Sequence, residues 1–155
     1  MYLKSTWVNK HGMKRTRSGR YEGCMVPEGA NVTFDPEKVE ATSFRWWYFV
    51  KRIGGKVVFN DYSYSSYTRR HQNKVKLLMK ELGIKTDVII EAPGGLQNLG
   101  AAIQHYNSKI KGLIAAIQKP GSRAAKNKER ARDVRDLQKR VQTLLVLIAA
   151  EARHD

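Results

Sequence analysis

The chain of 155 residues has a single cysteine, Cys24, and no long apolar run. One cysteine cannot form an internal disulfide, so a reducing compartment is the default environment. A membrane-spanning helix needs about 18 consecutive apolar residues, which no stretch of this sequence provides. The N-terminal sequence "MYLKSTWVNKHGMKR" also lacks the apolar segment of a signal peptide. We therefore expect a soluble protein of the cytoplasm that is not bound to a membrane.

The sequence also lacks the residue patterns of common enzymes. Its histidines are far apart, and neither cysteine nor carboxylate accompanies them at the spacing of metal ligands. The segment "APGGLQNLG" is rich in glycine but has neither the P-loop nor the Rossmann spacing. Asp61, Asp87 and Glu91 form no obvious pair for general acid–base chemistry. We expect no catalytic residues, no metal site and no cofactor.

Positive charge, in contrast, is in large excess. Residues 44–95 contribute +6 and residues 96–155 contribute +7 to the formal net charge of +15. Most of the charge therefore belongs to the part of the chain expected to fold, not to a detachable tail. A field of this sign attracts anionic partners, namely nucleic acid, nucleotides or an acidic membrane surface.

Strand patterns dominate the first half of the chain. The segments "SFRWWYFVKRI", residues 43–53, and "KVVFNDYSY", residues 56–64, are rich in aromatic and β-branched residues. Gly54-Gly55 between them predicts a tight hairpin. Both faces of the first segment are apolar, so we expect it to be covered on both sides. Shorter strands are predicted at "NVTF" (31–34) and "DVIIEAP" (87–93).

Helical patterns follow. Residues 65–83 predict a helix that Ser65 or Ser66 caps and Gly83 ends. From residue 96 onward, apolar residues recur at alternating spacings of three and four, in two runs that "KPGS" separates. The first run contains Leu96, Leu99, Ile103, Tyr106, Ile110, Leu113 and Ile117, and the second contains Val134, Leu137, Val141, Leu144 and Ile148.

These patterns predict an α+β fold in a single compact domain. A small antiparallel sheet with one packed helix (26–95) is followed by a C-terminal antiparallel helical hairpin (96–155). Residues 1–25 form a basic N-terminal arm, either a mobile arm or edge strand or a specific binding segment. Leu145, Val146 and Leu147 widen the apolar surface of the last helix, and this surplus predicts packing on the sheet or in a homodimer or larger homo-oligomer.

A dense run of cations lies between the two C-terminal helices, in "QKPGSRAAKNKERARDVRDL" (118–137). A helix N-terminus already carries a partial positive charge, so cations there oppose the helix dipole unless an anion binds. Ser122 is the expected cap, with Arg123 in the first turn and Lys126, Asn127 and Arg130 just after it. This arrangement is typical of a phosphate site, although a solvated helix end would have the same composition.

A second basic cluster, Arg69, Arg70 and His71, falls in the early turns of the predicted helix 65–83. It too opposes the helix dipole. The alternative is that these residues form only the solvated face opposite the apolar stripe.

The middle and end of the chain resemble the Thoeris anti-defence proteins of phages. The resemblance rests on "VVFNDYSYSSYTRRHQNKVKLLMKELGI", "EAPGGLQNL" and the helical pair broken by "KPGSRAAKNKER", and it covers residues 44–150. It implies a non-enzymatic protein that sequesters a cyclic ADP-ribose isomer and so blocks a bacterial antiphage response, in the host bacterial cytoplasm. It also implies assembly as dimers or hexamers and, in some members, a separate site for cyclic dinucleotides.

A cyclic ADP-ribose isomer presents a pyrophosphate, ribose hydroxyls and an adenine face. Arg123, Lys126 and Arg130 would hold the pyrophosphate. Hydrogen bonds to a ribose or to the adenine edge would come from Asn127, Gln97 or Asn98, and Tyr106 would stack on the base. Because a two-helix hairpin is too thin to enclose such a ligand, we expect the pocket at a subunit interface.

The competing hypothesis is a basic phage protein that binds nucleic acid. The net charge of +15 is its main support, since a basic arm, helix and loop together could follow a phosphate backbone. Against it, the sequence lacks a helix-turn-helix, a zinc finger and a basic region joined to a zipper. The cations also divide into separate clusters in the sequence.

Overall fold

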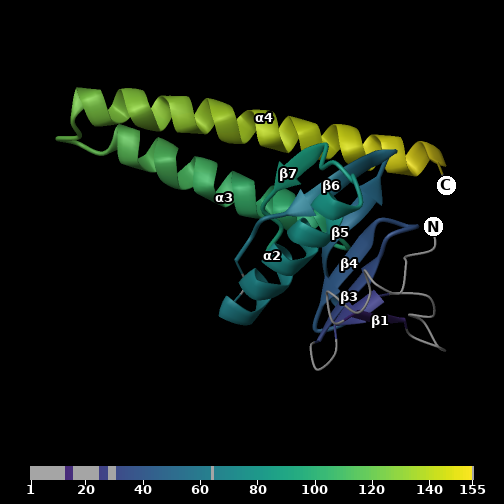
Figure 1. Ribbon diagram of the computed structural model, residues 1–155. Coiled ribbons are helices and arrows are strands. Elements are labelled where there is room, and N and C mark those ends of the chain that lie inside the picture. The colour runs from purple at the N-terminus through teal and green to yellow at the C-terminus, as the bar shows by residue number, and fades with distance from the viewer. Residues whose placement is uncertain (1–12, 16–24, 28–30, 64, 155) are drawn as a thin grey trace.

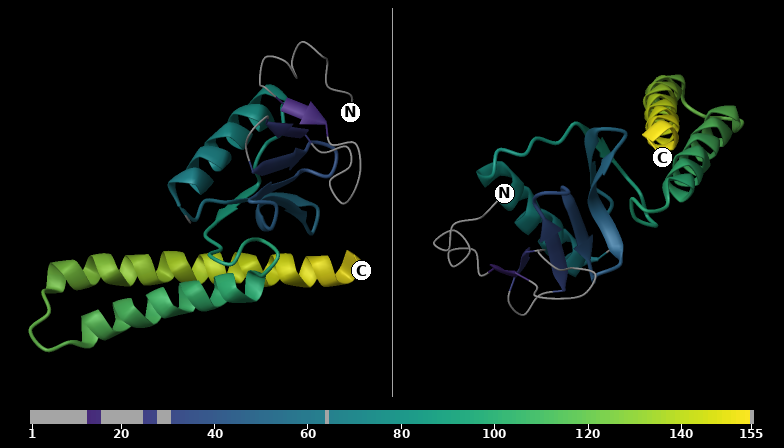
Figure 2. Two further views of the ribbon diagram at one scale, coloured as in Figure 1. Left: turned by 90° about the horizontal axis from the view of Figure 1, so that it is seen from below. Right: turned by 90° about the vertical axis from the view of Figure 1, so that its right-hand side faces the viewer.

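The computed structural model describes residues 13–15, 25–27, 31–63 and 65–154. Within these residues a single sheet of seven strands has the order β1-β2-β3-β4-β5-β6-β7, with α2 on one face and α3 and α4 on the other (Figures 1 and 2). The predicted α+β class is confirmed. The elements are β1 (Met13–Arg15), β2 (Met25–Pro27), β3 (Val32–Asp35), β4 (Glu40–Ser43), β5 (Trp47–Ile53), β6 (Lys56–Asn60), α2 (Ser66–Glu81), β7 (Val88–Ile90), α3 (Leu99–Gln118) and α4 (Ala124–His154).

Neighbouring strands are antiparallel except at one edge, where β7 pairs parallel with β6. The parallel pair follows from the connection, because α2 carries the chain back across the sheet between the two strands. The predicted arm, residues 1–25, lies outside the described residues except for β1 and the first residue of β2.

The β5–β6 hairpin is confirmed. Gly54 and Gly55 have φ of +57° and +79°, the left-handed conformation that a two-residue turn of this kind requires at both positions. The segment before it differs from the prediction, because β5 begins at Trp47 and residues 44–46 form the turn from β4. Phe44 and Arg45 in this turn also have positive φ, of 54° and 64°. The turn was not predicted because aromatic residues favour strands and because positive φ is unfavourable for residues other than glycine.

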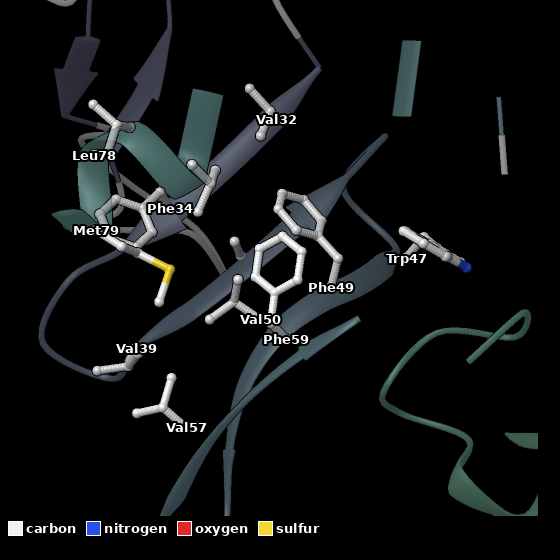
Figure 3. Packing of buried hydrophobic residues seen from close by; sticks show 12 residues of the cluster. Val32, Phe34, Val39, Trp47, Phe49, Val50, Val57, Phe59, Leu78 and Met79 are labelled. Carbon is white, nitrogen blue, oxygen red and sulfur yellow. The ribbon is translucent and has the colours of Figure 1, made fainter. Parts of the chain in front are cut away.

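The first apolar core lies between the sheet and α2 (Figure 3). Phe49 and Phe59 meet edge to face with their ring centroids 6.0 Å apart. Helix α2 begins after Ser65, whose hydroxyl accepts from the Thr68 N–H at 3.1 Å as the sequence predicts. The helix contributes Val75, Leu78 and Met79 to this core.

The second apolar core lies on the opposite face of the sheet, beneath α3 and α4. It contains Ile53, Val58 and Ile90 from the strands, Ala102 and Tyr106 from α3, and Leu144 and Leu147 from α4. Of the surplus apolar residues predicted on α4, Leu147 packs on the sheet, whereas Leu145 and Val146 are exposed.

The helical hairpin extends well beyond the sheet. Neither core contains a residue of α3 after Tyr106 or of α4 before Leu137, so the apolar side chains of these parts of the two helices pack on each other. Figure 1 shows the α3–α4 turn at the end of the molecule farthest from the sheet. The other end is anchored: the Gly54 N–H donates to a carboxylate oxygen of Glu151 at 3.0 Å.

Gly54 tests this anchor. A Cβ at position 54 would lie 2.7 Å from the Cβ of Ala150 on α4, whereas a Cβ at Gly55 would meet nothing within 4 Å. We expect Gly54→Ala to lower the free energy of unfolding by about 2–4 kcal/mol through positive φ and overpacking together. Gly55→Ala should cost only about 1–2 kcal/mol, from φ alone. Urea unfolding of both variants measures the difference, and equal losses would show that α4 does not press on this turn.

Candidate functional site

Two regions contain the residues that the sequence nominates. The first is the edge of the sheet at which the parallel strands β6 and β7 end, called here the carboxyl edge. The turn of residues 44–46, the N-terminus of α2 and the loop 91–98 before α3 lie there. Ligands of parallel sheets commonly bind at this kind of edge.

Arg69 and Arg70 differ in their surroundings at the carboxyl edge. The Arg69 guanidinium donates to the Asp61 carboxylate at 2.8 Å and to the Asp61 carbonyl at 3.2 Å. Lys76 lies 3.6 Å from the same carboxylate. Arg70 is exposed and lies over the Tyr67 ring, 5.7 Å from its centroid. Arg69 therefore fastens α2 to the end of β6, and only Arg70 projects into solvent.

His71 is a structural residue. It is buried, its Nδ1 lies 2.7 Å from the Ser43 hydroxyl, and its ring meets that of Phe44 edge to face at 5.4 Å. Burial lowers the pKa of His71 below its ordinary value of 6.5, because a charged ring would lose hydration. His71 thus supports the strained turn at Phe44 as a neutral side chain, which corrects its assignment to a ligand cluster.

Gln97 and Asn98 also have structural partners. The Gln97 amide accepts from the Tyr48 N–H at 3.2 Å and donates to the Trp46 carbonyl at 3.0 Å. The Asn98 side chain accepts from the Ala101 N–H at 3.1 Å and caps α3. Their hydrogen-bonding groups hold the chain at the carboxyl edge.

Tyr106 cannot take the role expected of it. The side chain is fully buried in the second core, and its hydroxyl accepts from the Glu91 N–H at 2.6 Å. Neither face of the ring can stack on a base, so the predicted stacking role is wrong. The heptad spacing that placed Tyr106 on the inner stripe of α3 was the better guide.

The carboxyl edge also contains a cluster of charged side chains that the sequence reasoning missed, although Glu91 itself had been considered. The Glu91 carboxylate lies 2.8 Å from the Lys109 ammonium and 3.4 Å from Nε2 of His105. The hydrogen bond from Lys109 is the main reason that the pKa of Glu91 is below its ordinary value of 4.5. The i, i+4 spacing of His105 and Lys109 was the available signal. This cluster ties α3 to the end of β7.

The second region is the hairpin tip, residues 119–130. A chain of hydrogen bonds runs through it: the Ser122 hydroxyl donates to the Ile117 carbonyl at 3.1 Å and accepts from the Asn127 amide at 2.8 Å. The Asn127 amide oxygen in turn accepts from the Arg130 guanidinium at 2.9 Å. Ser122 closes α3 and does not cap α4, which begins at Ala124, so Arg123 immediately precedes the helix.

Arg123, Lys126 and Arg130 share one face of the chain at the tip, because they are spaced i, i+3, i+7. Arg123 and Lys126 are exposed. In every ion pair between two described residues, the acid is Asp61 or Glu91. Arg123, Lys126 and Arg130 take part in none of these pairs, so they have no acidic partner in the described part of the chain.

The two regions are far apart in one chain. Helix α3 has 20 residues and separates Asn98 at its start from the tip, so the distance is about 30 Å. The sequence contains no aromatic residue after Tyr106. No single small ligand can therefore touch the tip cations and an aromatic ring at the carboxyl edge of the same subunit.

A groove with a volume of about 450 Å³ lies between α3 and α4, lined by Lys109, Gly112, Leu113, Asp133, Asp136 and Leu137. The two aspartates make it a poor site for an anion. Among the described residues, no group of three or more metal-ligating side chains is present, and no helix is long and apolar enough to cross a membrane.

The state of His71 can be tested by pH. Since its pKa is lower in the folded chain than in the unfolded chain, the unfolded state binds more protons below about pH 6.5. The free energy of unfolding should fall as the pH is lowered from 7 to 5, a window above the range where Glu91 titrates, and His71→Gln should reduce this fall. Urea unfolding at several pH values measures it. An NMR titration midpoint for His71 at or above 6.5 would contradict this assignment.

Comparison with known proteins gives this chain no relative: no family model, curated protein or solved structure matches it significantly.

Proposed function

We propose that the protein binds and sequesters a small cyclic nucleotide without catalysing its conversion. The ligand class is the cyclic ADP-ribose isomers that the resemblance to Thoeris anti-defence proteins implies. The observation that carries the proposal is the hairpin tip, where Arg123, Lys126 and Arg130 share a face and lack an acidic partner among the described residues.

The tip suits a pyrophosphate for two physical reasons. Arg123 and Lys126 lie beside the first turn of α4, where they add to the positive end of the helix dipole, and Arg130 lies one turn further along. Together the three cations match the two negative charges of a pyrophosphate. Asn127 already fixes the Arg130 guanidinium through a 2.9 Å hydrogen bond. Less side-chain freedom is then lost when an anion binds.

The base of the ligand needs a surface that the tip of the same chain does not offer. Exposed aromatic side chains lie instead at the carboxyl edge, where Trp46 is 51% and Tyr67 is 61% exposed. We therefore propose that the site is composite, with the tip of one subunit meeting the carboxyl edge of a second. Leu145, Val146 and Ile148, exposed on α4, are the apolar surface available to such a homo-oligomer.

Arg123→Glu separates binding from stability. A carboxylate just before α4 complements the helix dipole, so the free energy of unfolding should stay constant or rise by up to about 1 kcal/mol. Affinity for a cyclic ADP-ribose isomer should fall about 10- to 150-fold, because a charge-assisted hydrogen bond is replaced by repulsion.

Calorimetric titration and thermal melting of the same variant measure both effects. Lys85→Glu is the matched control, since Lys85 is exposed on a loop of the sheet domain and the change in net charge is the same. Unchanged affinity in Arg123→Glu would show that the tip cations form only a solvated helix end and do not bind the nucleotide.

Subunit complementation tests the composite site. At a ligand concentration near the Kd of the unchanged protein, Arg123→Glu and Trp46→Ala should each leave few sites of a homodimer occupied. After the two variants are mixed and allowed to exchange subunits, half of the dimers are mixed and each has one intact site, so about a quarter of the sites should recover. Equilibrium dialysis counts the sites. No recovery in a sample that light scattering shows to be dimeric would place the whole site within one subunit.

A further inference from the structure

The outward side of α4 carries a row of cations that plays no part in the proposed nucleotide site. Lys128, Arg132, Arg135 and Lys139 are spaced by four, three and four residues, which places them on one face of the helix. All four are exposed. From the first to the last, this basic stripe spans about 16 Å along the helix.

The stripe faces away from α3. Val134, Leu137 and Val141 of α4 are half-buried where the two helices pack, and the stripe lies on the other side of the helix. The acids of this segment form a neighbouring row roughly a quarter-turn away, and two of them, Asp133 and Asp136, line the groove toward α3. Charges of opposite sign are thus separated around α4.

None of the four cations forms an ion pair with a described acid. Every ion pair between described residues involves Asp61 or Glu91, and the stripe takes part in none. Lys128–Arg132 and Arg135–Lys139 are like-charge pairs at i, i+4, which destabilise a helix. Arg132–Asp136 is the one pair of opposite charge that a stripe cation makes at this spacing. The row therefore does little to stabilise the fold. An aligned row of cations without ion-pair partners, on a helix that projects from the sheet, is better explained by binding of an extended polyanion.

We propose that the basic stripe binds the sugar–phosphate backbone of a nucleic-acid duplex. Four cations along about 16 Å match several successive phosphates, whereas one small nucleotide could engage only part of the row. Single strands are held largely by stacking on aromatic rings, and no aromatic residue follows Tyr106. A lipid surface would require large apolar side chains among the cations, and the stripe contains none. The site is distinct from the nucleotide site, since the tip cations lie on another face of α4.

The test is fluorescence anisotropy with a 20-base-pair DNA duplex of arbitrary sequence, titrated with the full chain at several salt concentrations. Four phosphate contacts predict a slope of about −3.6 for log affinity against log salt, or a loss of about 150-fold between 50 and 200 mM. The double variant Arg132→Gln, Arg135→Gln should make the slope about 1.8 units shallower and lower the affinity at least about tenfold at 100 mM.

The matched control is Lys80→Gln, Lys85→Gln, which removes the same charge from exposed positions at the end of α2 and the loop after it. It should change affinity less than about twofold, because charges farther away than a Debye length of about 10 Å are screened. Glutamine keeps the helix propensity of arginine, and circular dichroism of the stripe variant checks that α4 is intact.

Two further ligands decide among partners. Tighter binding to a 20-nucleotide single strand, or to vesicles containing phosphatidylserine, than to the duplex would overturn the proposal. An equal loss of affinity in the stripe variant and the control would also overturn it. Retention of cyclic ADP-ribose isomers by the stripe variant should be unchanged, so failure here is distinguishable from failure of the proposed nucleotide site.

Discussion

Leu144 and Leu147 lie buried between α4 and the sheet, and this contact determines where the rest of the helical hairpin lies. Two hydrogen bonds from the same part of α4 add to this contact. The Glu151 carboxylate accepts one from the Gly54 N–H, and the Arg140 guanidinium donates the other to the Ile89 carbonyl at 3.2 Å. Only the C-terminal part of a 31-residue helix is fixed in this way. The first part, which α3 alone supports, is therefore carried away from the sheet as a charged arm (Figure 2).

Only the C-terminal part of α4 is buried against the sheet. In the N-terminal part, different faces of the helix carry side chains of different charge. The tip cations Arg123, Lys126 and Arg130 lie on one face, the acids that line the groove lie on another, and the basic stripe faces outward. At physiological ionic strength the Debye length of about 8 Å is shorter than the diameter of a helix with its side chains, about 10–12 Å. Charges on opposite faces of α4 are therefore largely screened from one another.

The parts of the fold that local chemistry determines could be predicted from the sequence. They include the Gly54-Gly55 hairpin, the Ser65 cap and the two C-terminal helices. The turn at Phe44 and Arg45 could not, because contacts with His71 and Gln97 hold a conformation that propensity disfavours. The burial of Tyr106 could not be predicted either, because helical spacing does not distinguish a ring in the core from a ring that stacks on a ligand. The distance between the tip and the carboxyl edge could be derived only once the bounds of α3 were known. The basic stripe could likewise be recognised only once the bounds of α4 were known.

The central claim is that α4 presents two separate anion-binding faces, and mapping of backbone amides by NMR tests it most directly. Titration with a cyclic ADP-ribose isomer should shift amides of residues 119–130, together with residues near Trp46 of a second subunit. Titration with a short DNA duplex should shift residues 128–139 and leave those near Trp46 unchanged. If both ligands shift one common set of amides, or if neither shifts α4, the claim of two faces is wrong.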